Sequence, residues 1–210
     1  MKDYYETRFK FDKDRTKVWR ALCEYLQQFT TKNGAILEFG SGYCDFINNI
    51  EADKKYAVDI MADSQEYCKQ EVQFFCEDIC NKLPIEDRSI DMVFASNLFE
   101  HLNDEQLNAA LTLIKVYLKK GGKLALVQPN YKYCYKHYFD DYTHVKVFSH
   151  ISLTDFLESQ GFTIERSEPK FIPFSMKSRL PKSYFLTKMY LKSPFRPSAK
   201  QMLVVARYDA

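Results

Sequence analysis

The chain has 210 residues, of which 46% are hydrophobic and 28% are charged, and it carries a formal net charge of +2. This composition excludes a disordered protein, and the length favours a single domain over residues 1–210, because two domains would each bury only a thin core. The basic residues gather in residues 166–200, which hold nine Lys or Arg and one acid, and this local excess does not fit a general nucleic-acid binder.

The N-terminus and the cysteines both favour a cytoplasmic location. The opening stretch, MKDYYETRFKFDKDR, is charged and has no apolar signal segment, and no run of about 18 apolar residues is present. The six cysteines are scattered through a chain too long to need disulfide staples, so we expect reduced thiols. Cys76 and Cys80 have no second pair of ligands in the sequence, and no metal site is predicted.

Helical and strand periods of apolar residues alternate along the chain. A helix is predicted at 14–29, and a buried strand at 35–39 leads through a glycine turn into a helix that holds Phe46 and Ile47. Further strands are predicted at 55–60, 71–76 and 90–96. The later elements are a helix through 107–118 that ends at Gly121 and Gly122, a strand at 123–128, a helix at 149–160, and strands near 162–166 and at 201–208.

Strands that alternate with helices predict an α/β fold: a doubly wound, mostly parallel seven-stranded sheet with helices on both faces. The segment at about 168–200, between the last two strands, is too long for a hairpin and is predicted to form a cap or insertion. In such a sheet, ligands bind beyond the carboxyl ends of the strands.

Polar residues follow the predicted strands at that edge. Gly40 and Gly42 come directly after the first strand, where the backbone can approach a ligand closely. Asp59 ends the second strand, at the distance after Glu38 where an acid can accept hydrogen bonds from ribose hydroxyls. The polar residues after the third and fourth strands are Asp78, Ser96 and Asn97. Each could alone be a turn or a helix cap, but their joint order predicts a nucleoside site.

The identity of the nucleoside follows from what the turn lacks. A dinucleotide-binding turn would have glycine at position 45, where Asp45 would repel a pyrophosphate, and no phosphate-binding loop of the ATP or GTP type is present. A ligand with a ribose and a base but no phosphate fits better. S-adenosylmethionine has this chemistry.

The stretches ILEFGSGYCDF, YAVDI, CEDI, IDMVFASNLFEHL and LKKGGKLALVQPN resemble successive motifs of the class I S-adenosylmethionine-dependent methyltransferases, over roughly residues 30–130. The C-terminal stretches around YFDDYTHVKVFSHISLTDFLESQGF and KQMLVVAR are similar to bacterial members of the methyltransferase type 11 group, which are associated with sugar and polysaccharide biosynthesis. Cys44 departs from the family pattern, which commonly has a third glycine there, so we expect an altered fit with binding retained.

The resemblance implies S-adenosylmethionine as cofactor, with S-adenosylhomocysteine as its product, and it assigns the residues that bind it. These are Glu38, Gly40, Ser41 and Gly42 around the methionine part, Asp59 and Ile60 at the ribose, Asp78 and Ile79 at the adenine, and Ser96 and Asn97 below the sulfonium.

A hydroxyl acceptor would benefit from a general base near the sulfonium, whereas an already nucleophilic acceptor can do without one. His144, with Asp141 as the acid that orients it, is the candidate pair, since both lie after the fifth strand, where family members cover the acceptor. His101, in FEHL, is a further candidate. The alternative for His144 is that it pins a loop, and the alternative for His101 is a structural role at the start of the next helix.

These expectations lead to a methyltransferase that acts on a small molecule or a glycan, by O-methylation. The alternatives are a methyltransferase-like protein that binds without turnover, and an RNA or protein methyltransferase. The aromatic and basic residues in 170–200 are expected to form an ordinary cap with solvated lysines, and the next alternative is a peripheral contact with the inner face of a membrane, ahead of a nucleic-acid contact.

Overall fold

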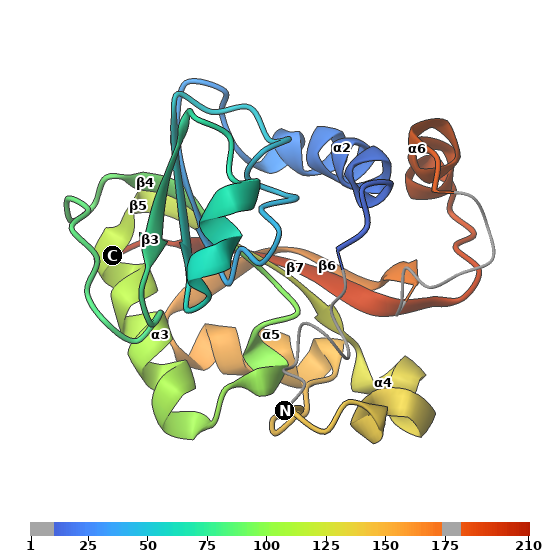
Figure 1. Ribbon diagram of the computed structural model, residues 1–210. Coiled ribbons are helices and arrows are strands. Elements are labelled where there is room, and N and C mark those ends of the chain that lie inside the picture. The colour runs from blue at the N-terminus through green and yellow to red at the C-terminus, as the bar shows by residue number, and fades with distance from the viewer. Residues whose placement is uncertain (1–10, 174–181) are drawn as a thin grey trace.

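The computed structural model describes residues 11–173 and 182–210. The first ten residues of the charged N-terminal stretch and residues 174–181 of the predicted cap lie outside the described residues. The sheet has seven strands in the order β3-β2-β1-β4-β5-β7-β6, and β7 runs antiparallel to both of its neighbours (Figure 1). The predicted α/β fold with a mostly parallel sheet is confirmed.

The seven strands are β1 (Ala35–Phe39), β2 (Lys54–Asp59), β3 (Val72–Cys76), β4 (Ile90–Ser96), β5 (Leu118–Pro129), β6 (Phe162–Pro173) and β7 (Ala199–Tyr208). All five residues of β1 are buried. This pattern is typical of a parallel strand covered on both faces, and it places β1 in the middle of the sheet.

Helices cover both faces of the sheet (Figure 1). The α-helices are α2 (Arg15–Leu26), α3 (Asp104–Tyr117), α4 (Tyr131–Cys134), α5 (His150–Ser159) and α6 (Tyr184–Lys192), and the short 3-10 helices are η1 (Gln27–Phe29), η2 (Ala62–Tyr67), η3 (Phe99–His101) and η4 (Tyr135–Asp140). The apolar sides of α3 and α5 pack on one face, and those of α2 and α6 belong to the core on the other. Within the described ranges, no helix is long and apolar enough to cross a membrane.

The helix predicted to hold Phe46 and Ile47 is wrong, because residues 43–49 form a series of turns. Two later amides in this stretch keep helical hydrogen bonds to carbonyls four residues earlier. Before these two amides, which belong to Asn48 and Ile50, the Ile47 amide donates instead to the Glu38 carboxylate at 3.0 Å, so the helical hydrogen-bond pattern does not start there. Both apolar side chains are nevertheless fully buried. The apolar pattern therefore predicted their burial correctly, but it did not predict the backbone conformation.

Gly121 and Gly122 were predicted to end the helix, and this prediction is wrong. Both glycines lie inside β5. The helix ends at Tyr117, and the pairing of β4 with β5 shifts register across the glycines. Gly121 has φ +78°, and a Cβ atom on Gly122 would lie 2.8 Å from the Lys119 carbonyl oxygen. The glycines therefore permit an irregularity in the strand and not a helix cap.

Candidate active site

A cavity of about 1460 Å³ lies at the carboxyl ends of the parallel strands. All of the residues that the sequence predicts for cofactor binding line this cavity: Glu38, Gly40, Ser41, Gly42, Asp59, Ile60, Asp78, Ile79, Ser96 and Asn97. The predicted catalytic residues His101, Asp141 and His144 line it as well. The fold therefore brings together groups that are far apart in the sequence.

The glycine turn after β1 needs a left-handed backbone at three positions. The φ angles are +67° at Gly40, +50° at Gly42 and +55° at Cys44, so the cysteine adopts the conformation that a third glycine would adopt. A Cβ atom on Gly40 would lie 3.0 Å from the Leu98 side chain. The amides of Gly40 and Ser41 both donate to the Val58 carbonyl, which ties the turn to the end of β2.

Asp59 anchors this turn from the end of β2. One carboxylate oxygen accepts a hydrogen bond from the Gly42 amide at 2.7 Å, and the other accepts from the Met61 amide at 3.0 Å. The residue is 5% exposed. Because each carboxylate oxygen has a second lone pair, Asp59 can accept ligand hydroxyls while it holds the turn.

Glu38 supports the turn from within the core. It is 3% exposed, and its carboxylate accepts the hydrogen bond from Ile47 described above. Burial raises the pKa of Glu38 well above its ordinary value. Glu38 therefore has a structural task in the turn, besides its place in the wall of the cavity.

The residues after β2, β3 and β4 differ in exposure. Ile60 is 72% exposed and Ile79 is 6% exposed, so two aliphatic side chains line a region where a flat base could pack. The Asp78 carboxylate accepts a hydrogen bond from the Cys80 amide at 2.8 Å. Asn97 has φ +51°, a conformation that asparagine tolerates better than most residues. Its backbone amide donates a hydrogen bond to the Val127 carbonyl.

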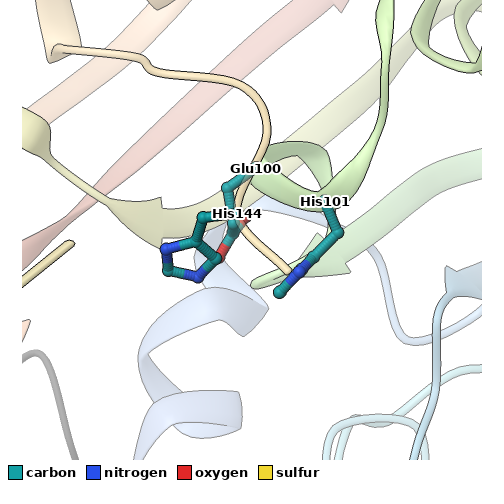
Figure 2. Close-up of side chains that lie close together, drawn as sticks. All are labelled: Glu100, His101 and His144. Carbon is teal, nitrogen blue, oxygen red and sulfur yellow. The ribbon is translucent and has the colours of Figure 1, made fainter. Parts of the chain in front are cut away.

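His101 and His144 lie side by side, with ring centroids 4.8 Å apart (Figure 2). His144 Nδ1 is 2.6 Å from the Tyr138 carbonyl oxygen, and His101 Nδ1 is 2.9 Å from the Thr143 hydroxyl oxygen. Burial lowers the pKa of His101, and the neighbouring His144 lowers it further. A neutral imidazole is the form that can accept a proton or bind an electrophile.

Asp141 connects to His101 through a hydroxyl group. Its carboxylate accepts hydrogen bonds from the Thr143 hydroxyl at 2.7 Å and from the Thr143 amide at 3.1 Å. The Thr143 oxygen that donates to Asp141 is the one that contacts His101. Toward His144, the hydrogen bond runs between main chains, from the His144 amide to the Asp141 carbonyl at 3.3 Å.

Glu100 is a member of this cluster that the sequence reading missed. It is 1% exposed, it lies beside the two histidines in Figure 2, and burial raises its pKa to about 8. The signal available was its position in FEHL, directly before a residue that had been singled out. A glutamate next to a helix start is ordinarily solvated, so only the tertiary structure marks this one.

Other features of the cavity also come from residues that the sequence reading did not select. Arg15, at the start of α2, forms an ion pair with Asp45 at 2.9 Å and lies over the Tyr43 ring. Among the lining residues that fall within 11–173 and 182–210, nine are Asp or Glu and three are Lys or Arg. This excess of acid favours a positively charged ligand.

A family model described as a methyltransferase domain matches residues 11–167. Phosphoethanolamine N-methyltransferase 1 from Triticum aestivum is 33% identical over 100 residues, a match that covers 42% of the chain and 20% of that relative. The chain thus matches about a fifth of the length of this curated relative.

Two solved structures have a similar fold. A SAM dependent methyltransferase from Archaeoglobus fulgidus superposes with a TM-score of 0.68 at 19% identity, with 97% of each chain covered. The PH0226 protein from Pyrococcus horikoshii OT3 superposes with a TM-score of 0.67 at 18% identity, with 99% of each chain covered. At these identities the superpositions support the fold alone.

Proposed function

The chain belongs to the methyltransferase domain family, and from this premise we propose that it uses S-adenosylmethionine as its methyl donor and methylates a small-molecule or glycan-type acceptor at oxygen. The observation that carries the proposal is the single cavity that combines the predicted donor residues with the two adjacent imidazoles. Both halves of a transfer reaction would thereby lie in one space.

The cavity has the features that this donor requires. The turn of Gly40 and Gly42 presents backbone without side chains, Asp59 beside Ile60 supplies a carboxylate for ribose hydroxyls, and Ile79 supplies an apolar surface for adenine. S-adenosylmethionine supplies a methyl group on a positively charged sulfur, so the protein has mainly to align the acceptor and exclude water. The acidic lining of the cavity complements the charge on that sulfur.

The acceptor hydroxyl would lose its proton to an imidazole. We propose His144 as this base, because its Nδ1 proton is held by the Tyr138 carbonyl and its lone pair is therefore on Nε2. Asp141 and Thr143 orient His101 beside it. In this proposal Asp141 serves the histidine pair as a positioning residue, while His101 and His144 are the groups that meet the acceptor.

An amine acceptor is the second candidate. The curated relative is named a phosphoethanolamine N-methyltransferase, and the cavity is lined by more acids than bases. An acidic cavity attracts a protonated amine, and a neutral imidazole could accept its proton before transfer. N-methylation would therefore use the same residues on a different nucleophile.

We also propose that α6 and the residues after it contact the inner face of a membrane. Several large apolar side chains are exposed there: Phe185, Leu186, Met189 and Phe195. Basic residues surround them in the sequence, which is the composition of a surface that docks on anionic lipid. Sedimentation with anionic vesicles should be strong at low salt, and binding that does not weaken as salt rises would contradict electrostatic docking.

The test of the acceptor class is transfer of labelled methyl groups from S-adenosylmethionine to fractionated extract of the native host, followed by identification of the labelled product. We expect label on a hydroxyl of a small molecule or glycan. Label on nitrogen would establish the second candidate, and label that ribonuclease or protease removes would contradict a small-molecule acceptor.

A further inference from the structure

We propose that Glu100, His101 and His144 together bind one divalent first-row transition-metal ion in the cavity. One potential ligand atom from each residue lies within 4.8 Å of the others. The three side chains come from η3 and from the loop before α5, and Figure 2 shows that they lie close together. Two imidazole nitrogens and a carboxylate oxygen form a recurrent ligand set for such ions.

The Glu100 carboxyl group is the strongest observation. Its side chain is buried, and among the described residues neither of its oxygens has a hydrogen-bond partner. An unpartnered buried carboxyl group is costly, and native proteins rarely keep one without a ligand, an ion or a functional reason. A bound cation would supply the missing partner for these two oxygens.

The hydrogen bonds of the two histidines place their lone pairs on the other ring nitrogen. A carbonyl oxygen only accepts, so His144 Nδ1, at 2.6 Å from the Tyr138 carbonyl, carries the proton. The Thr143 hydroxyl donates to Asp141, so it accepts from His101 Nδ1. Both imidazoles then have Nε2 as the basic atom, and metal-binding histidines are commonly oriented by such contacts on the second nitrogen.

The two segments that carry the ligands are fastened to each other. The Glu100 carbonyl accepts hydrogen bonds from the amides of Val145 and Lys146, at 2.9 Å and 3.0 Å. The contact between His101 and Thr143 adds a side-chain link between the same segments. The protein therefore orders the cluster before any ion binds, and binding requires only small side-chain movements.

The movements follow from ordinary coordination distances. Ligand atoms at about 2.1 Å from a tetrahedral ion lie about 3.4 Å apart, so the three atoms must close on the ion by roughly an ångström. Imidazole ligands favour Zn²⁺ or Fe²⁺ over Mg²⁺ and Ca²⁺, which prefer oxygen ligands throughout, and Mn²⁺ accepts the carboxylate of a mixed set.

Three protein ligands leave positions open toward the cavity. The role of the ion rests on the proposed O-methylation. The acceptor oxygen would bind at an open position of the ion, which would lower the pKa of the acceptor hydroxyl group. The ion would then replace the imidazole as the group that activates this hydroxyl for transfer. The binding of the ion itself does not depend on that reaction, and it can be measured without an acceptor.

The test uses Mn²⁺ as the probe, because Mn²⁺ avoids the cysteines, which would also capture Zn²⁺. The full chain is stripped with EDTA and titrated with Mn²⁺, and the free ion is counted by electron paramagnetic resonance. Echo-modulation spectra then report nitrogen atoms bound to Mn²⁺. We expect one bound ion per chain with histidine nitrogen coupling.

Glu100→Gln is the main variant, because it keeps the shape of the side chain and removes the carboxylate ligand, whose oxygens have no hydrogen-bond partner among the described residues. We expect its Mn²⁺ affinity to fall at least about tenfold, while its thermal unfolding temperature without metal stays at or above that of the parent protein. His150→Gln is the matched control, since His150 lies at the start of α5 and is not among the residues that line the cavity.

Three results would overturn the site: Mn²⁺ bound without nitrogen coupling, equal affinity in Glu100→Gln, or an equal loss in His150→Gln. Loss of binding in His137→Gln with binding kept in Glu100→Gln would also overturn it, because His137 pairs with Asp140 elsewhere in the cavity wall. Full turnover by metal-free protein would refute the role of the ion and leave the proposed methyl transfer standing.

Discussion

Asp59→Asn tests whether the carboxylate at the end of β2 both anchors the glycine turn and binds the donor. Asparagine keeps one acceptor oxygen and replaces the other with an amide group that only donates. One of the two backbone amides that Asp59 now accepts, Gly42 or Met61, therefore loses its partner. A hydrogen bond to a charged group contributes about 1.5–3 kcal/mol to stability. Because this hydrogen bond is buried, we expect its loss to cost a value in the upper part of that range.

Two results should follow. The unfolding temperature should fall by roughly 3–10 °C, because in a domain of this size each kcal/mol of lost stability lowers it by a few degrees. The dissociation constant for S-adenosylhomocysteine should rise by about 10- to 100-fold, since each factor of ten corresponds to about 1.4 kcal/mol of lost contact with the ribose hydroxyls.

The assays are isothermal titration calorimetry with S-adenosylhomocysteine and a thermal melt on the same preparation. Asp53→Asn is the matched control, because Asp53 is exposed just before β2 and does not line the cavity. A lowered melting temperature with affinity within about twofold of the parent protein would refute the ribose contact and leave only the anchoring role. An equal loss of affinity in Asp53→Asn would refute the reasoning altogether.

Further predictions concern the base, the turn and an ion cluster. His144→Ala should lower kcat by about 10²- to 10⁴-fold and leave donor affinity in calorimetry unchanged; unchanged turnover would remove it from the base role. Gly40→Ala, with φ +67° and a contact to Leu98, and Gly161→Ala, with φ +87° and open space, should both lose about 1–2 kcal/mol in denaturant melts, but only the first should weaken donor binding. Although burial alone would raise the pKa of Glu168, hydrogen bonds from Tyr25, Arg166 and Arg196 lower it overall. The ionised Glu168 therefore contributes to the free energy of unfolding above the ordinary glutamate pKa, and this contribution is lost as pH falls through the lowered pKa. Glu168→Gln should cost about 3 kcal/mol of stability at pH 7 and less in acid. A cost that does not change with pH would contradict this.

The cavity residues proposed to bind the cofactor could be predicted to lie together because they sit at fixed places relative to single strands. A residue that directly follows a buried parallel strand must lie at the carboxyl edge of the sheet, so Gly40, Asp59 and Asp78 could be placed without knowledge of their neighbours. Cys44 adds a detail from the same logic: its φ of +55° shows that the backbone needs a left-handed residue there even though glycine is absent.

The acceptor half could be predicted only in part. His101 and His144 were selected as separate candidates, and their contact depends on how the loop before α5 folds back on η3. Asp141 was expected to orient His144, whereas the side-chain hydrogen bonds that are seen run through Thr143 to His101. Loops take their conformation from long-range contacts, and local periodicity carries no record of these.

Sequence alone determined the order of the strands, the class of sheet and the edge of the sheet at which the cavity lies, because each of these follows from local apolar periods. Tertiary structure decided the rest. The Ile47 amide donates to the Glu38 carboxylate and not to a helical carbonyl. Glu100 is buried beside two histidines, and its oxygens have no hydrogen-bond partner among the described residues. Both outcomes depend on which distant groups exclude water from a site, and that is a property of the assembled fold.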